Sequence, residues 1–126
     1  MPFHYGGWII NIWSVLGKFG VPSYTAYCTT KHGMIGFTRA LALKVVGRGI
    51  TVNTICPGWV DTPFNDAFTR QMGGRDALLH YVKEKIPLGR FASVDEIAEA
   101  ILFLASDRSS FMTGHALVID GGECIA

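Results

Sequence analysis

The sequence predicts an α/β fold of about three parallel strands with flanking helices, and two observations point to it. Short runs of apolar and β-branched residues alternate along the chain with longer stretches of helical periodicity. Because the first of these runs, Trp8–Ile12, is almost continuously hydrophobic, it suits a parallel sheet that helices cover on both faces. A length of 126 residues corresponds to one domain with its own core.

The expected strands are short, and glycine or proline follows the last two of them closely. The first two bracket a long helical stretch, so together they form a βαβ unit in which both strands run parallel. Glycine and proline are poorly suited to the interior of a strand and mark its end. We expect the strands at Trp8–Ile12, Ile50–Ile55 and Ala116–Ile119.

Two longer helices are expected. The first runs from about Tyr24 to Val46, where nearby glycines stop it. The second follows Ser93, where the sequence Ser-Val-Asp-Glu matches a capping box, and runs to about Ala105. Their apolar residues recur at three- and four-residue steps and are expected to face the core: Tyr27, Met34, Ile35, Thr38, Leu41, Ala42 and Val45 in the first, and Ile97, Ile101, Leu102 and Leu104 in the second.

The stretch from Phe64 to Pro87 contains two weakly helical segments on either side of Gly73-Gly74. Because paired glycines interrupt a helix, we expect this stretch to form a mobile helical lid. Two interpretations of its apolar residues stay open, since they either contact an apolar or acyl-like ligand or pack inward. These residues are Phe64, Phe68, Met72, Leu78, Leu79 and Tyr81.

The composition excludes several classes of protein. A net charge of +1, from 11 basic and 10 acidic residues, predicts neither nucleic acid nor an anionic membrane as a partner. Three cysteines form no disulfide framework or zinc motif, and the histidines show no ligand spacing, so we expect a reduced, cytoplasmic protein without a metal. No apolar stretch reaches the roughly 18 residues of a membrane span.

A tyrosine and a lysine stand four residues apart on the first expected helix. Because residues four apart share a helix face, the phenol of Tyr27 and the ammonium group of Lys31 can share a site. A nearby positive charge favours the phenolate and lowers the tyrosine pKa from about 10, which makes the phenol a general acid/base. Taken alone, this spacing is more often an accident of packing.

Other polar and glycine residues follow the first two expected strands. Ser14 comes just after the first strand, at the strand end where parallel sheets bind ligands, and its hydroxyl can hold a substrate oxygen. Pro57 and Gly58 follow the second strand and let a flat ring approach the backbone, while Thr62 can donate to a phosphate. Each feature by itself is more often part of an ordinary loop or turn.

Taken together, the motifs resemble those of the short-chain dehydrogenase/reductase family. The resemblance extends from about residue 8 to 122, and its specificity comes from several motifs in the same order and spacing rather than from any one of them. The motifs are Asn11-Ile12-Trp13-Ser14, Tyr27-Cys28-Thr29-Thr30-Lys31, Gly49 to Gly58 with Thr62, Pro87-Leu88-Gly89-Arg90, and Asp120-Gly121-Gly122.

The resemblance implies a role for each matching residue. Tyr27 matches the catalytic acid/base, Lys31 the residue that lowers the tyrosine pKa and binds the nicotinamide ribose, and Ser14 the residue that orients the carbonyl. The reaction implied is reversible alcohol–carbonyl interconversion with NAD or NADP, on a small-molecule substrate. The implied cofactor-binding residues are Tyr27, Lys31, Pro57, Gly58, Val60 and Thr62.

The resemblance also implies a partial Rossmann-like, doubly wound sheet. The family's glycine-rich diphosphate turn does not occur in the sequence, so we expect the chain to be the C-terminal catalytic half without the N-terminal dinucleotide-binding half. Within it we expect a βαβ unit with the catalytic residues at 8–62, a substrate lid at 63–90, and a final helix and strand at 91–126. The strand at Trp8–Ile12 then forms an apolar edge, which favours a homo-oligomer or pairing with the missing half.

Two functions follow from this reasoning. The first is an NAD(P)-dependent oxidoreductase in which Tyr27 acts as general acid/base. The alternative is a non-catalytic truncated remnant or interaction subunit that keeps the fold and no longer binds the cofactor, because the diphosphate turn is missing.

Overall fold

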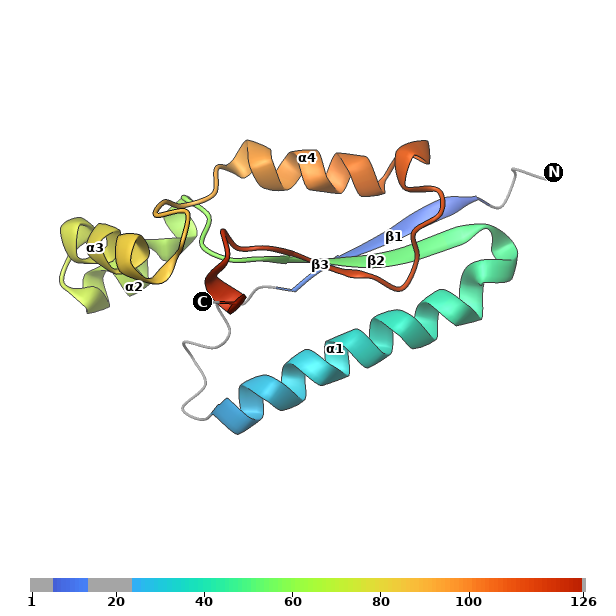
Figure 1. Cartoon of the computed structure of the whole chain (residues 1–126), viewed down its shortest axis with the longest axis horizontal. Helices are drawn as coiled ribbons and strands as arrows, with labels where there is room; N and C mark the ends of the chain where they lie inside the picture. Colours follow the sequence, from blue (N-terminus) through green and yellow to red (C-terminus); the bar gives the residue numbers. More distant parts are fainter. Residues whose placement is uncertain (1–5, 14–23, 126) are drawn as a thin grey trace.

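The computed structural model describes residues 6–13 and 24–125 of the chain. In this part, three strands form one parallel sheet in the order β1-β2-β3 (Figure 1). Strand β1 (Gly7–Ile12) pairs with β2 (Ile50–Pro57) from Gly7 opposite Ile50 to Ile12 opposite Ile55. Strand β3 (Ala116–Ile119) pairs with the second half of β2. The α/β class and the three expected strands are confirmed.

Helices cover the two faces of this sheet. Helix α1 (Tyr24–Val45) lies on one face and α4 (Val94–Leu104) on the other (Figure 1). Side chains alternate along β2, so Thr54 faces α1, where its hydroxyl lies 2.7 Å from that of Thr38. Asn53 points to the other face and fastens β2 to the loop before β3, because its side chain bonds the carbonyl of Met112 and the N–H of His115.

Short 3-10 helices join the main elements. They are η3 (Val46–Arg48), η4 (Pro63–Asn65), η5 (Asp107–Ser109) and η6 (Glu123–Ile125).

The core lies between the sheet and the two covering helices. Its fully buried side chains include Val52 and Ile55 of β2 and Leu104 of α4, with Ala42 almost as deeply buried on α1. The expectation that Leu102 faces the core is wrong, since this side chain is 62% exposed. Successive residues of a helix are separated by about 100°, so Leu102 points away from the stripe that its neighbours bury.

The expected lid stretch consists of two helices, α2 (Asp66–Met72) and α3 (Arg75–Lys85), which lie beyond the carboxyl ends of the strands (Figure 1). Gly73 ends α2 in a left-handed conformation with φ of 103°, which residues with a side chain rarely adopt. Its N–H reaches the carbonyl groups of the last turn, as in a typical helix C-terminus. The helical content of this stretch is therefore confirmed.

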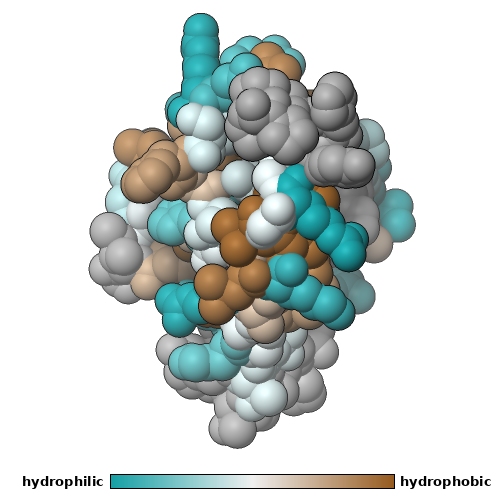
Figure 2. Space-filling model, turned by 90° about the vertical axis from the view of Figure 1, so that its right-hand side faces the viewer, coloured by the Kyte–Doolittle hydropathy of each residue, from teal (hydrophilic) through white to brown (hydrophobic). Residues whose placement is uncertain are grey.

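Strand β1 forms one edge of the sheet, as the sequence predicted, and Trp8 and Ile12 on this strand are 46% and 59% exposed. Figure 2 views the molecule from the end where α1 finishes and shows apolar residues gathered among polar ones. At this end of the sheet the exposed apolar side chains also include Val46, and Phe111 in the loop before β3. No helix among the described residues is long and apolar enough to cross a membrane.

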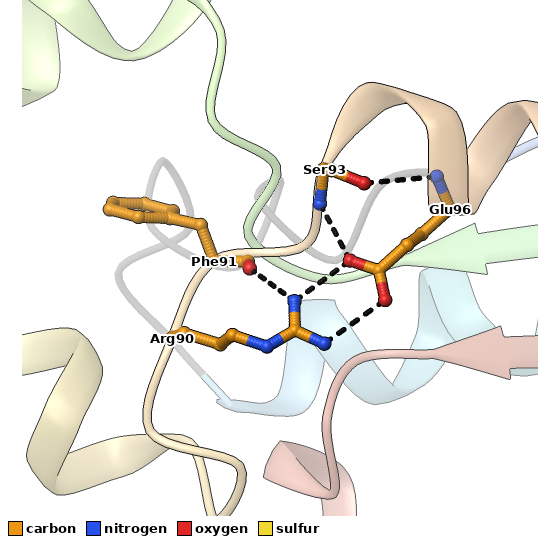
Figure 3. Close-up of polar contacts among 4 residues, drawn as sticks. All are labelled: Arg90, Phe91, Ser93 and Glu96. Atoms are coloured by element: carbon orange, nitrogen blue, oxygen red, sulfur yellow. Dashed lines mark hydrogen bonds and ion pairs between the residues drawn. The ribbon is translucent and has the colours of Figure 1, made fainter.

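The predicted capping box is present at the start of α4. The Ser93 hydroxyl accepts a hydrogen bond of 3.1 Å from the N–H of Glu96, and the Glu96 carboxylate accepts one of 2.9 Å from the N–H of Ser93 (Figure 3). The structure adds a partner that the motif did not indicate. Arg90 donates to both carboxylate oxygens of Glu96, at 2.8 and 3.0 Å, and also to the carbonyl of Phe91.

These contacts make the first turn of α4 sensitive to acid. The hydrogen bonds from Arg90, followed by that from the Ser93 backbone, lower the pKa of Glu96 from 4.5 to about 2. Because the pKa is lower in the folded protein than in the unfolded chain, the contacts stabilise the fold above about pH 4.5 and are lost as the pH falls through about 2.

We therefore expect Glu96→Gln to lower the urea midpoint of unfolding at pH 7, and we expect this difference to shrink as the pH falls toward about 2. Glu99→Gln, which removes the same charge one turn later on α4, is the control. A difference between the Glu96 variant and the parent that stays constant from pH 7 to about 2 would contradict the assignment.

Candidate active site

The carboxyl ends of the three parallel strands lie at one end of the sheet, which is where parallel sheets bind ligands. The chain stays paired one residue beyond β1, since the N–H of Trp13 donates to the carbonyl of Ile55 at 2.8 Å. Ser14 is the next residue, and it lies outside the described residues. Helix α1 begins at this same end of the sheet (Figure 1).

Lys31 lies on α1 near the carboxyl end of β2. Its side chain is half-buried. Cys56 is buried at the end of β2. Burial raises the pKa of its thiol, and the positive charge of Lys31 offsets part of this rise. Cys56 is two residues beyond Thr54 and so points toward the same helix. The positive charge of Lys31 therefore has an effect at the end of β2, while its role in a site stays a prediction.

Tyr27 and Lys31 lie on one uninterrupted helix. Since α1 runs without a break from Tyr24 to Val45, the two residues are one turn apart on the same face. The side chain of Tyr27 lies outside the described part of the structure, as does the whole of Ser14. That the phenol, the ammonium group and the serine hydroxyl meet at one point therefore stays a prediction.

Pro57 and Gly58 are buried where β2 leaves the sheet. The N–H of Gly58 donates to the carbonyl of Ile119 at 2.9 Å, so β2 and β3 remain joined at their ends. A Cβ atom at position 58 would lie 2.8 Å from the Cβ of Asp120. The structure thus supplies a packing reason for this glycine, because any side chain would push the ends of the two strands apart.

Val60 and Thr62 belong to a segment that connects the sheet to the lid. Val60 forms an isolated parallel bridge with Ala92, flanked by hydrogen bonds from Asp61 N–H to the Ala92 carbonyl and from Ala92 N–H to the Trp59 carbonyl, at 3.1 and 2.9 Å. Thr62 precedes η4, is half-buried, and makes no capping hydrogen bond with its hydroxyl. The hydroxyl is therefore not committed to the turn that follows it.

Sequence reasoning missed two side-chain contacts that hold this segment. Asn65 is buried, and its amide group donates to the carbonyl of Val60 at 2.7 Å. Asp61 receives two hydrogen bonds from Arg75 of α3, at 3.1 and 3.2 Å. Asparagine before a helix usually indicates an N-cap, yet Asn65 makes no capping bond with its side chain, so the sequence pattern gave no sign of this use.

The closing Asp120-Gly121-Gly122 motif has a structural role. The Asp120 carboxylate accepts hydrogen bonds from the N–H groups of Gly122 and Cys124, at 2.9 and 2.8 Å. Burial raises the pKa of Asp120, but these hydrogen bonds outweigh it and hold the pKa below its ordinary value. The carboxylate therefore stays charged and fixes the turn that follows β3.

Three of the six apolar residues named for the stretch from Phe64 to Pro87, namely Met72, Leu78 and Tyr81, belong to a hydrophobic cluster or pack against it. Leu78 and Val82 of α3 are buried in a cluster with Trp59 and Phe91, and Ile86 completes it. Trp59 meets the rings of both Tyr81 and Phe91 edge-on. Met72 and Tyr81 pack against this cluster, Leu79 is 43% exposed, and the side chains of Phe64 and Phe68 lie outside the described residues. Inward packing therefore accounts for several of these residues.

Across residues 6–13 and 24–125, no group of three or more histidine, cysteine, aspartate or glutamate side chains is placed to hold a metal ion.

Comparison with known proteins places the chain among enzymes of one family. A family model described as "Enoyl-(Acyl carrier protein) reductase" matches residues 2–123. The chain is 43% identical over 119 residues to the 3-oxoacyl-[acyl-carrier-protein] reductase FabG of Thermotoga maritima, covering 94% of this chain and 46% of that protein. It is 42% identical over 119 residues to the short-chain dehydrogenase fogB of Aspergillus ruber, covering 94% and 42% of the two chains.

The fold has the same relatives. The structure of a gluconate 5-dehydrogenase from Burkholderia cenocepacia, in complex with NADP and tartrate, matches with a TM-score of 0.77 and 32% identity, and the match covers 98% of this chain and 47% of that one. The chain thus spans about half the length of the relatives it matches. On the match to the family model and these relatives, the chain belongs to the short-chain dehydrogenase/reductase family.

Proposed function

We propose that this chain carries the catalytic residues of an NAD(P)-dependent oxidoreductase that interconverts an alcohol and a carbonyl in a small molecule. The observation that carries the proposal is that Tyr27 and Lys31 lie one turn apart on the unbroken helix α1, which packs against β2 through Thr38 and Thr54. The direction of the Lys31 effect on the pKa of the Cys56 thiol, at the end of β2, supports it. Family membership and the NADP-bound gluconate 5-dehydrogenase relative support the same conclusion.

In this proposal the proton moves at Tyr27. Its hydroxyl donates a proton to the carbonyl oxygen in the reductive direction and accepts one from the alcohol in the oxidative direction. Lys31, one turn further along α1, stabilises the phenolate by its charge and brings the phenol into the useful range of pKa. Ser14 hydrogen-bonds the substrate oxygen and holds it in line with the phenol.

In this proposal the residues that follow β2 hold the nicotinamide end of the cofactor. Bound NAD or NADP would supply or accept the hydride. Lys31 is half-buried and accessible at the sheet edge, and the hydroxyl of Thr62 is not used for capping, so both can bind polar groups of the cofactor. Pro57, Gly58 and Val60 connect the end of β2 to Thr62, and in this proposal their backbone lies along the nicotinamide; Pro57 and Gly58 are buried at the end of β3.

The proposal divides the chain into three parts. Residues 8–62 form the βαβ unit with the catalytic residues, 63–90 the substrate lid, and 91–126 the final helix and strand. The exposed edge of β1, with Trp8 and Ile12, is where a second segment of sheet from the same protein or another chain would add.

The proposal is tested by cofactor binding followed by turnover. NADH and NADPH are titrated into the protein while nicotinamide fluorescence is recorded, and carbonyl reduction is then measured for the chain alone and mixed with a separately made segment that carries a glycine-rich diphosphate turn. We expect saturable binding and turnover at least in the mixture. Folded protein that neither binds nor turns over in either arrangement would instead support the non-catalytic remnant.

A further inference from the structure

The segments that enter and leave the helical pair α2–α3 meet at a junction beside the sheet, and the exit segment also bonds the turn after β3 through Leu88 N–H and the Gly121 carbonyl. The entry and exit segments lie side by side, because Asp61 and Trp59 exchange backbone hydrogen bonds with Ala92 around the Val60–Ala92 bridge. This junction is also where the segment Val60–Thr62 leaves β2. Any change in the position of the helical pair is therefore applied directly to residues that we propose to contact the cofactor.

An ion pair between α3 and Asp61 adds to this junction. Arg75, the first residue of α3, donates through both terminal nitrogens to the two carboxylate oxygens of Asp61, at 3.1 and 3.2 Å. The guanidinium group also lies over the ring of Phe91, 5.3 Å from its centroid. Two-point binding and stacking restrict the orientation of an arginine more than a single contact does.

The surroundings make this contact specific. Among the ion pairs of the described residues, His80–Glu84 lies within α3 and Arg90–Glu96 holds the start of α4, whereas Asp61–Arg75 joins α3 to the exit of β2. On its other side the segment is held by Asn65, whose amide bonds the Val60 carbonyl. Val60–Thr62 is thus held between one buried amide and one ion pair contributed by the lid.

We infer that Arg75 is a positioning residue, which acts through Asp61 to couple the position of the α2–α3 pair to the segment Val60–Thr62 and so to the affinity for the nicotinamide cofactor. The inference rests on the proposed function for its effect on the cofactor. It does not need that function for the link itself, since the contact between α3 and Asp61 exists in the chain without a ligand.

The link is tested by a double-mutant cycle of Asp61→Asn, Arg75→Gln and both together. Exposed ion pairs have modest energies, so each single variant is expected to speed hydrogen exchange of the α3 amides and to raise the dissociation constant for NADPH by roughly two- to fivefold. The double variant should show no further change, because both substitutions break the same contact. In steady-state kinetics the KM for the cofactor rises and kcat is unchanged.

Two further variants separate positioning from general destabilisation. Glu84→Gln breaks a contact within the same helix, that of Glu84 with His80, without touching Asp61, and it is expected to leave the dissociation constant for NADPH at the parent value. Arg75→Lys keeps the charge but loses the two-point geometry, so its values should fall between those of the parent and Arg75→Gln.

The outcomes distinguish the inference from the proposed function. Additive single effects, an equal effect of Glu84→Gln on the dissociation constant, or unchanged exchange in both single variants would overturn the link. If the parent protein binds NADPH and the variants alter exchange without altering its affinity, the coupling to the cofactor is refuted. If the parent binds no cofactor at all, both the proposed function and the coupling to the cofactor are refuted. The hydrogen-exchange cycle still decides whether Arg75 links α3 to Asp61.

Discussion

Replacing Tyr27 by phenylalanine is expected to lower kcat by at least about 100-fold, the smallest effect typical of a general acid/base. The substitution removes a hydroxyl and keeps the ring, so packing along α1 is preserved. Without the hydroxyl, the proposed donor of a proton to the substrate oxygen is lost, and the charge of Lys31 has no phenol to act on. Steady-state carbonyl reduction, measured on an assembly shown to be active, checks the prediction.

The control for this experiment is Tyr81→Phe, which removes the same group from α3 and keeps the ring that meets Trp59. We expect this variant to retain a kcat close to that of the parent. Circular dichroism and the urea midpoint establish that both variants are folded. If Tyr27→Phe turned over at the parent rate, the proton donor would have to be sought elsewhere, whereas an equal loss in both variants would indicate a general effect on the fold.

Replacing Leu78 by alanine is expected to lower the free energy of unfolding by about 2–5 kcal/mol, the usual range for a large buried side chain cut back to a methyl group. Leu78 of α3 is fully buried in the cluster that it forms with Trp59, Val82, Ile86 and Phe91. The loss combines the transfer free energy of the removed atoms with the cost of the cavity left behind. Urea denaturation followed by tryptophan fluorescence measures it, since Trp59 lies in the same cluster.

The neighbouring Leu79 is the matched control, because it has the same chemistry on the same helix and its side chain is 43% exposed. Leu79→Ala is expected to change the free energy of unfolding by about 0.5 kcal/mol or less, as is usual for a surface substitution. Similar losses in the two variants would show that the burial of Leu78 is not what stabilises the lid. Faster proteolysis within α2 and α3 of the Leu78 variant would place the damage in the lid.

Residues 8–12 and 50–55 illustrate how local patterns predict strands. The first run is mostly apolar and both are rich in β-branched residues, and the structure extends them only slightly, to Gly7–Ile12 and Ile50–Pro57. The first turn of α4 was likewise readable, because a capping box requires two residues three positions apart and its hydrogen bonds form within one turn. Leu102 shows the limit of such patterns, since its apolar character did not reveal that it faces solvent.

By itself the sequence determined the elements and the pairing of Tyr27 with Lys31 on one helix, because both depend on residues a few positions apart. Only the tertiary structure decided which distant residues meet. It brought Thr38 to the hydroxyl of Thr54, Arg75 to the carboxylate of Asp61, and the end of β3 against Gly58. These contacts join residues from 14 to 62 positions apart. The physical reason is that the paths of the chain between them, and not the residue types, set their distances.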